Sequence, residues 1–146
     1  MSQKPTLTFA LMDAPFESGR STTAFRLLGS TTAFRLLDIA AARGYHINVF
    51  AYEGAVFIPF AHQKPHANAV HGHDASEENH PLPKDWVAAL IESAEQHGGK
   101  LDWVNCGLCV DERGAMDTIP SGRRGSPVDF WKMATESDNT LVIGTR

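Results

Sequence analysis

The sequence has few cysteines, little net charge and no long apolar run, and each shortage excludes a class of protein. Two cysteines among 146 residues are too few to crosslink a small secreted domain. A formal charge of -4 gives no basic surface of the kind that binds nucleic acid. No segment approaches the roughly 18 uninterrupted apolar residues of a membrane-spanning helix, and residues 1–8 lack the features of a signal peptide. We therefore expect a cytoplasmic protein that binds neither nucleic acid nor membrane.

The length and composition are those of one globular domain. The chain is 42% hydrophobic and 21% charged, and it is long enough to bury a core without disulfides or a structural metal. We therefore expect a single domain over residues 1–146.

The apolar pattern alternates between strand and helix spacing. Strands are expected at residues 6–12, 46–52, 101–105 and 140–144. Helices are expected at residues 21–43, 83–97 and 108–113, and another begins at Ser126, Pro127 and Asp129. Such alternation predicts an α/β, flavodoxin-like domain of three layers with a mostly parallel sheet. Ligands and chemistry in these sheets gather beyond the carboxyl ends of the strands.

A nine-residue tandem duplication lies within the first expected helix. The segment STTAFRLL occupies residues 21–28 and recurs at 30–37. At about 100° per residue, nine residues turn a helix through roughly 900°, so the two copies would face opposite sides. Only one copy can then serve one core face. We expect residues 30–43 to pack, because the second copy runs directly into Ile39, Ala40 and Ala41.

The segment CGLC, from Cys106 to Cys109, is the strongest chemical signal in the chain. It follows the expected strand at 101–105, at the edge where chemistry gathers. Thiolates are the nucleophiles of disulfide and persulfide chemistry, and nearby cations or helix N-terminal amides favour them. Gly107 permits close backbone approach and Arg113 is a candidate helper cation. The plain alternative is that both cysteines are buried as small apolar residues.

Two other kinds of protein also use a CxxC pair. A thioredoxin-like oxidoreductase places CxxC after a strand, but it needs a β-α-β-β-α run and a cis-proline strand afterwards. A zinc site needs four ligands, so histidines would have to complete it. Candidate histidines are His62, His66, His71, His73 and His80. These lie in a polar segment, residues 59–83, that we expect to form a long surface loop; it could bind a metal or a protein partner, or simply be solvated.

Phosphate-binding motifs are absent: neither GxGxxG nor GxxxxGK[ST] occurs in the sequence. Arg123 and Arg124, flanked by glycine and serine, could receive an anion near a helix N-terminus, or form an ordinary solvated turn.

Residues 83–114 resemble the DsrE/DsrF/TusD sulfur-relay family. In that family a helix ending in glycine leads to a strand, and then to a cysteine followed eight residues later by the glycine of an Arg-Gly pair. Here that count runs from Cys106 to Gly114, which Arg113 precedes. The opening strand, the strand at INVFAYEGAV and the closing helix and strand agree more loosely.

The resemblance implies a sulfurtransferase-like sulfur carrier that uses no metal or other cofactor. Sulfane sulfur would be accepted as a persulfide on Cys106 and passed to a partner thiol, with Cys109 as supporting thiol and Arg113 as helper. It also implies sulfur donor and acceptor proteins, among them a TusA-like carrier, and assembly into homo- or hetero-oligomers. Cys109 is absent from some branches of the family, so it could resolve the persulfide, form a disulfide or have no role.

Overall fold

The computed structural model describes residues 3–15, 32–64 and 82–143 of the chain. Within these residues, five strands form one sheet in the order β4-β3-β2-β1-β5. The strands are β1 (Thr6–Leu11), β2 (His46–Ala51), β3 (Lys100–Cys106), β4 (Gly122–Gly125) and β5 (Asn139–Ile143). Every pairing in this order is parallel, so the carboxyl ends of the strands share one edge of the sheet.

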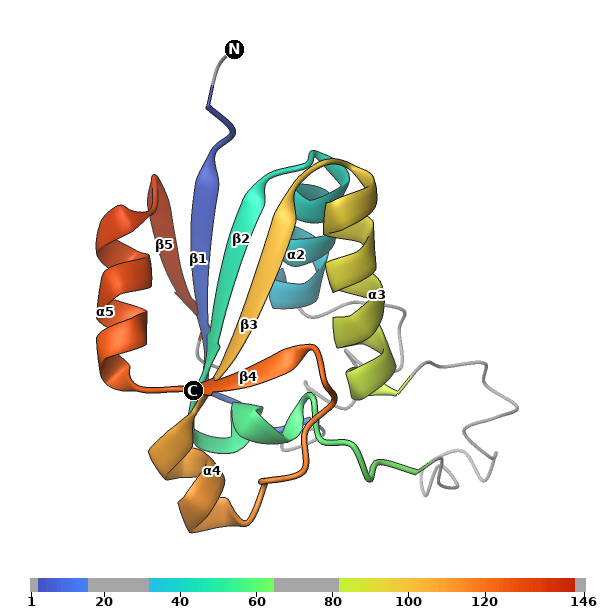
Figure 1. The fold of residues 1–146 in the computed structure, drawn as a ribbon, viewed down its shortest axis with the longest axis vertical. Helices are drawn as coiled ribbons and strands as arrows, with labels where there is room; N and C mark the ends of the chain where they lie inside the picture. The colour runs from blue at the N-terminus through green and yellow to red at the C-terminus, as the bar shows by residue number, and fades with distance from the viewer. Residues whose placement is uncertain (1–2, 16–31, 65–81, 144–146) are drawn as a thin grey trace.

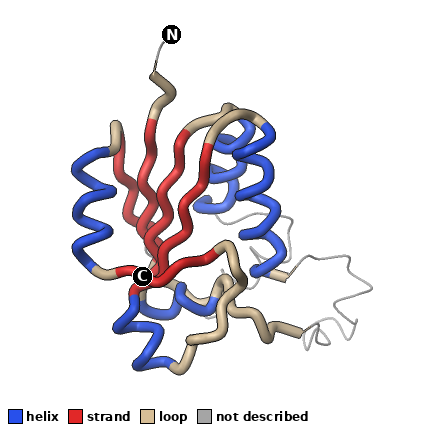
Figure 2. Tube along the Cα trace, in the orientation of Figure 1, coloured by secondary structure: helices blue, strands red, loops and turns tan. Residues whose placement is uncertain are grey.

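Helices cover both faces of the sheet (Figure 1). They are α2 (Thr32–Ala42), α3 (Pro83–Gln96), α4 (Gly107–Arg113) and α5 (Pro127–Glu136), with a 3-10 helix, η1 (Glu53–Phe57), after β2. The chain advances from β1 through β2 to β3 in one direction, so right-handed crossovers place α2 and α3 together on one face. The connection to β5 runs back across the sheet, which puts α5 on the other face; Figure 2 shows the three layers. The predicted α/β three-layer architecture is confirmed.

The core is divided into two clusters by the alternation of side chains along the strands. Trp103 is fully buried in the cluster under α2 and α3. Val104 and Cys106 belong to the second cluster, which includes Met133 of α5. Both cysteines therefore lie within a packed apolar cluster. In the described ranges, no helix has the length and apolar character to cross a membrane.

Strand β4 was not predicted from the sequence. Its residues are GRRG, and the sequence suggested a turn at this place. The strand contains no apolar residue from which it could be predicted. It is a short edge strand that pairs only with β3, so little of it faces the core. The chain thus contains a strand at Arg123 and Arg124 where sequence reasoning expected a loop.

Backbone and packing contacts hold the start of the segment that follows η1. Pro59 is fully buried, and Phe60 forms an isolated antiparallel bridge with Thr118. The remainder of the expected loop, residues 65–81, lies outside the described residues, together with His66, His71, His73 and His80.

The second copy of the duplicated segment supplies the start of α2. Ala33, Phe34 and Leu37 are buried against the sheet, and Ala40 and Ala41 continue the same face. This is the face that the helical register predicts for a packed second copy. The first copy, residues 21–28, lies outside the described residues.

The duplication supplies a matched pair of variants, Leu37→Ala in the second copy and Leu28→Ala in the first. Leu37 is fully buried, so we expect its removal to leave a cavity and to lower the free energy of unfolding by about 2–5 kcal/mol. Because only one copy can serve the core face, we expect Leu28→Ala to cost less than about 1 kcal/mol. Urea unfolding followed by circular dichroism compares the two, and equal losses would show that both copies pack.

Candidate functional site

The two cysteines meet at the carboxyl edge of the sheet. Cys106 is the last residue of β3 and directly precedes α4, with an extended backbone (φ -60°, ψ 116°). Cys109 follows in the first turn of that helix. Both thiols are free, and the residues are only 5% and 8% exposed. The prediction that Cys106 ends a strand is therefore confirmed, and both thiols are more deeply buried than a reactive pair at a strand end suggests.

Cys109 lies in the same buried cluster as Cys106. Burial is the main cause that raises the pKa of the Cys109 thiol, and the neighbouring Cys106 and the charge of Glu53 act in the same direction. The backbone N–H of Glu53 opposes this effect. Cys109 therefore holds its proton at neutral pH.

Glu53 adopts a backbone conformation that is unusual for its residue type. Its φ is 51°, in the left-handed region, and no other non-glycine residue in the described ranges has a positive φ. Such a conformation costs on the order of 1–3 kcal/mol and persists only where the surrounding structure holds it. Here it accompanies the influence of the Glu53 amide on the Cys109 thiol. Backbone strain is thus concentrated at the cysteine pair.

Arg113, the cation expected to assist Cys106, forms an ion pair with Glu53. This ion pair joins the last turn of α4 to η1. The structure thus links Arg113 to the cysteines through Glu53, whose amide contacts Cys109.

A second cation, Arg124 of β4, lies beside Cys106. Its guanidinium binds both carboxylate oxygens of Asp111, with an Nη1–Oδ1 distance of 2.8 Å. A Cβ atom placed on Gly107 would lie 2.8 Å from the Arg124 Nε, so the absence of a side chain there lets the guanidinium approach the start of α4. The hydrogen bonds with Asp111 are the main cause that raises the pKa of Arg124, and the charge of Cys106 contributes. Arg124 is therefore placed to interact with an anionic sulfur at Cys106.

The two arginines of β4 serve different partners because successive side chains of a strand point to opposite sides. Arg123 pairs with Asp102 of β3, with an Nη2–Oδ2 distance of 2.9 Å, and also with Asp129 of α5. Arg124 points to α4 instead. One arginine therefore holds the edge strand to the sheet, and the other faces the cysteine site.

Asn105 ties this site to the rest of the fold from a buried position. Only 1% of the residue is exposed. Its Oδ1 accepts a hydrogen bond from the indole N–H of Trp103 (3.1 Å), and its Nδ2 donates to the carbonyl oxygen of Val56 in η1 (3.4 Å). Strand β3 and η1 are therefore joined directly beside Cys106.

Sequence reasoning missed Glu53 and Asn105, and it considered Arg124 only as part of a turn that could receive an anion or be solvated. Glu53 carries no motif, because its role depends on a positive φ that only the fold reveals. The glycines around Arg124 were a usable signal, because Gly125 pairs with Cys106 and its carbonyl oxygen would lie 3.1 Å from a Cβ atom on Gly107. Gly107 was correctly interpreted as a place of close backbone approach.

The described residues contain no group of three or more histidine, cysteine or acidic side chains arranged to hold a metal. His62 lies within these residues and contacts Asp117, with an Nε2–Oδ2 distance of 3.0 Å. The metal-binding alternative relied on the other histidines of the loop, which lie outside the described residues.

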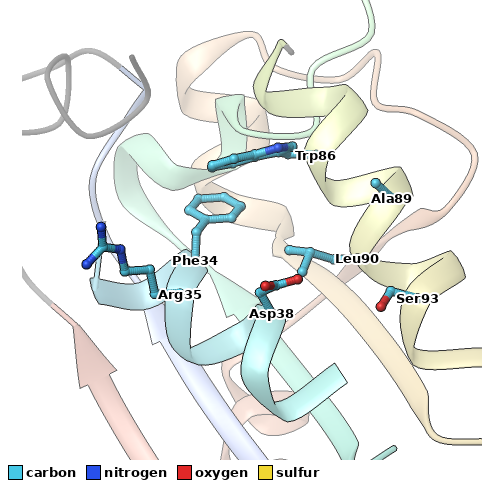
Figure 3. A pocket seen from close by; sticks show the side chains of 7 residues that line it. All are labelled: Phe34, Arg35, Asp38, Trp86, Ala89, Leu90 and Ser93. Carbon is cyan, nitrogen blue, oxygen red and sulfur yellow. The ribbon is translucent and has the colours of Figure 1, made fainter. Parts of the chain in front are cut away.

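A cavity of about 340 Å³ lies between α2 and α3, away from the cysteines (Figure 3). The rings of Phe34 and Trp86 form one wall, with centroids 5.1 Å apart. The full lining comprises Phe34, Arg35, Asp38, Trp86, Ala89, Leu90 and Ser93. It contains no nucleophile of the CGLC segment, so the candidate site remains at the edge of the sheet.

The charge of Arg124 can be tested with two alkylating reagents that differ in charge. In a Cys109→Ala background, we expect Arg124→Gln to slow the reaction of Cys106 with anionic iodoacetate several-fold more than its reaction with neutral iodoacetamide, because a cation attracts the anion. Arg113→Gln is the matched control, since its partner is Glu53. Mass spectrometry measures both rates. An unchanged ratio in Arg124→Gln would contradict an electrostatic role for this residue.

The pKa of Cys109 predicts a pH dependence for its own alkylation. Because burial raises this pKa, the thiolate is scarce at neutral pH and its fraction grows only as the pH passes above the ordinary thiol range. We expect Cys109 in a Cys106→Ser variant to react slowly with iodoacetamide at neutral pH. Between neutral and alkaline pH, we expect its rate to rise by a larger factor than the rate of the reference thiol glutathione. Titration at or below the ordinary thiol range would contradict the burial argument.

Comparison with known proteins agrees with this fold. The sequence model of the DsrE/DsrF-like family matches residues 6–143, which include the whole cysteine segment. Curated protein sequences gave no significant match. Among solved structures, the YchN protein from E. coli is similar, with a TM-score of 0.64 and 15% sequence identity over 97% of this chain and 100% of that chain. The likeness to YchN shows the fold, and the family match shows that the chain belongs to the DsrE/DsrF-like family.

Proposed function

We propose that the chain is a cytoplasmic sulfur carrier that accepts sulfane sulfur as a persulfide on Cys106 and passes it to a partner thiol. Membership of the DsrE/DsrF-like family is consistent with a role in sulfur relay. The observation that carries the proposal is the position of Cys106: it ends an interior parallel strand, shares a buried cluster with a second thiol and lies beside the guanidinium of Arg124.

The proposed chemistry is thiol exchange. The Cys106 thiolate attacks the outer sulfur of a donor persulfide, the donor S–S bond breaks, and the donor thiolate leaves. The sulfur atom now attached to Cys106 is attacked in turn by the thiolate of an acceptor. Neither step needs an external oxidant or reductant, so the exchange requires no cofactor.

The charges around the two sulfurs support Cys106 as the carrier. A persulfide is an anion near neutral pH, and Arg124 supplies a cation on the β4 side of Cys106. Cys109 lies on the η1 side, where burial and the charge of Glu53 keep it protonated. The exchanging sulfur is thus assigned to Cys106 and the supporting thiol to Cys109. We assign Arg113 an indirect role, holding Glu53 in place.

Exposed apolar side chains near the site support partner proteins as donor and acceptor. Leu108, within CGLC, is 65% exposed, and Met116 just beyond α4 is 67% exposed. Large apolar side chains at a protein surface mark contact sites when they gather. We propose that an acceptor of the TusA-like kind docks over α4.

We assign assembly with further copies or related chains to α5, where Val128 and Trp131 are exposed one helical turn apart.

The thioredoxin-like alternative does not fit the order of elements. After Cys109 the chain continues as α4, β4, α5 and β5, and all strand pairings of the described sheet are parallel. A thioredoxin-like protein needs two adjoining strands and a cis-proline there, and the described residues contain no cis peptide bond. The chain shares with thioredoxin-like proteins only the CxxC pair itself.

Replacement of Cys106 by serine tests the proposal. We expect the parent protein to gain the mass of one sulfur atom after brief treatment with glutathione persulfide, and Cys106→Ser to gain none, because only Cys106 is placed to act as acceptor. Intact-mass spectrometry under non-reducing conditions measures the gain, and Cys109→Ser is the matched control that we expect to retain it. An undiminished gain in Cys106→Ser would refute the assignment.

A further inference from the structure

Cys106 and Cys109 are spaced so that a small movement allows them to form an internal disulfide. Residues three positions apart at the start of a helix have Cβ atoms about 5–6 Å apart, and a disulfide needs about 3.5–4.5 Å. Cys106 and Cys109 are both free, and both belong to the same buried cluster. A shift of about 1–2 Å therefore brings their sulfurs to bonding distance.

We propose that Cys109 resolves the persulfide on Cys106, so that the protein also reduces bound sulfane sulfur to hydrosulfide when no acceptor takes it. This inference rests on the proposed function, because it requires a persulfide on Cys106. It adds a second outcome for the same sulfur atom: transfer to a partner, or release as sulfide.

The resolving step balances without a cofactor. The Cys109 thiolate attacks the inner sulfur of the persulfide, which is the Sγ atom of Cys106. The bond between that atom and the outer sulfur breaks, and the outer sulfur leaves as hydrosulfide with the proton that Cys109 gave up. The two cysteines lose two electrons and form a disulfide, and the sulfane sulfur gains them. A dithiol reductant must then reduce the disulfide before another cycle.

The surroundings of Cys109 make resolution slower than transfer to a well-placed acceptor. Cys109 is enclosed in the same buried cluster as Cys106, which keeps its sulfur close to that residue. Burial and the carboxylate of Glu53 limit the fraction of thiolate at Cys109, while Arg124 stabilises the anionic persulfide from the other side. A persulfide on Cys106 therefore survives long enough to meet a partner, and is discharged internally when none binds.

The test compares the fully reduced parent with Cys109→Ser and Cys109→Ala, each treated with one equivalent of glutathione persulfide. Serine keeps a side chain of nearly the same size, and alanine keeps the site apolar, so the two variants test the packing in different ways. Intact mass and released sulfide are followed over time, with Cys106→Ser as the control for spontaneous decay of the reagent. Circular dichroism confirms that each variant is folded.

We expect the parent to release about one equivalent of sulfide and to lose the mass of two hydrogen atoms as its disulfide forms. We expect the Cys109 variants to keep the added sulfur on Cys106 for at least about tenfold longer. Equal persistence in the parent and in both variants would overturn the inference and leave the carrier function standing. Failure of the folded Cys109 variants to gain a sulfur atom, or a gain of glutathione in its place, would overturn the carrier function itself and the inference with it.

Discussion

The hydrogen bonds of Asn105 are the constraint on which the cysteine site depends. A buried amide that lost its partners would cost free energy, so the hydrogen bond from the Trp103 indole orients Asn105 and the one to the Val56 carbonyl fixes η1 against β3. The position of η1 in turn fixes Glu53, which influences the Cys109 thiol. The cysteine site at the carboxyl edge of the sheet is thus positioned by hydrogen bonds within the core.

The parallel sheet explains why opposite charges reach the two sides of one pair of thiols. The carboxyl ends of β2, β3 and β4 lie side by side, so residues far apart in sequence meet there: Glu53 after β2, Cys106 at the end of β3, and Arg124 in β4. Both sulfurs are almost fully enclosed. Their charged neighbours differ, because Glu53 acts on Cys109 and Arg124 lies beside Cys106.

Much of the fold could be predicted from the sequence because its signals are local. The apolar runs of β1, β2 and β3, and the proline and capping box at the start of α5, are visible in a few consecutive residues. The partners of the cysteines could not be predicted in this way. Arg113 is near Cys106 in sequence yet pairs with Glu53, whereas Arg124 is brought to the site by an edge strand without apolar residues.

The bare backbone at Gly107 has a consequence for how this protein can evolve. Every replacement of a glycine adds a Cβ atom, and here that atom would lie 2.8 Å from the Arg124 side chain and 3.1 Å from the Gly125 carbonyl oxygen. The arginine can swing aside, but it then leaves the sulfur that it faces. A substitution at position 107 therefore displaces the side chain at position 124, so the two positions constrain each other although they lie in different elements of the fold.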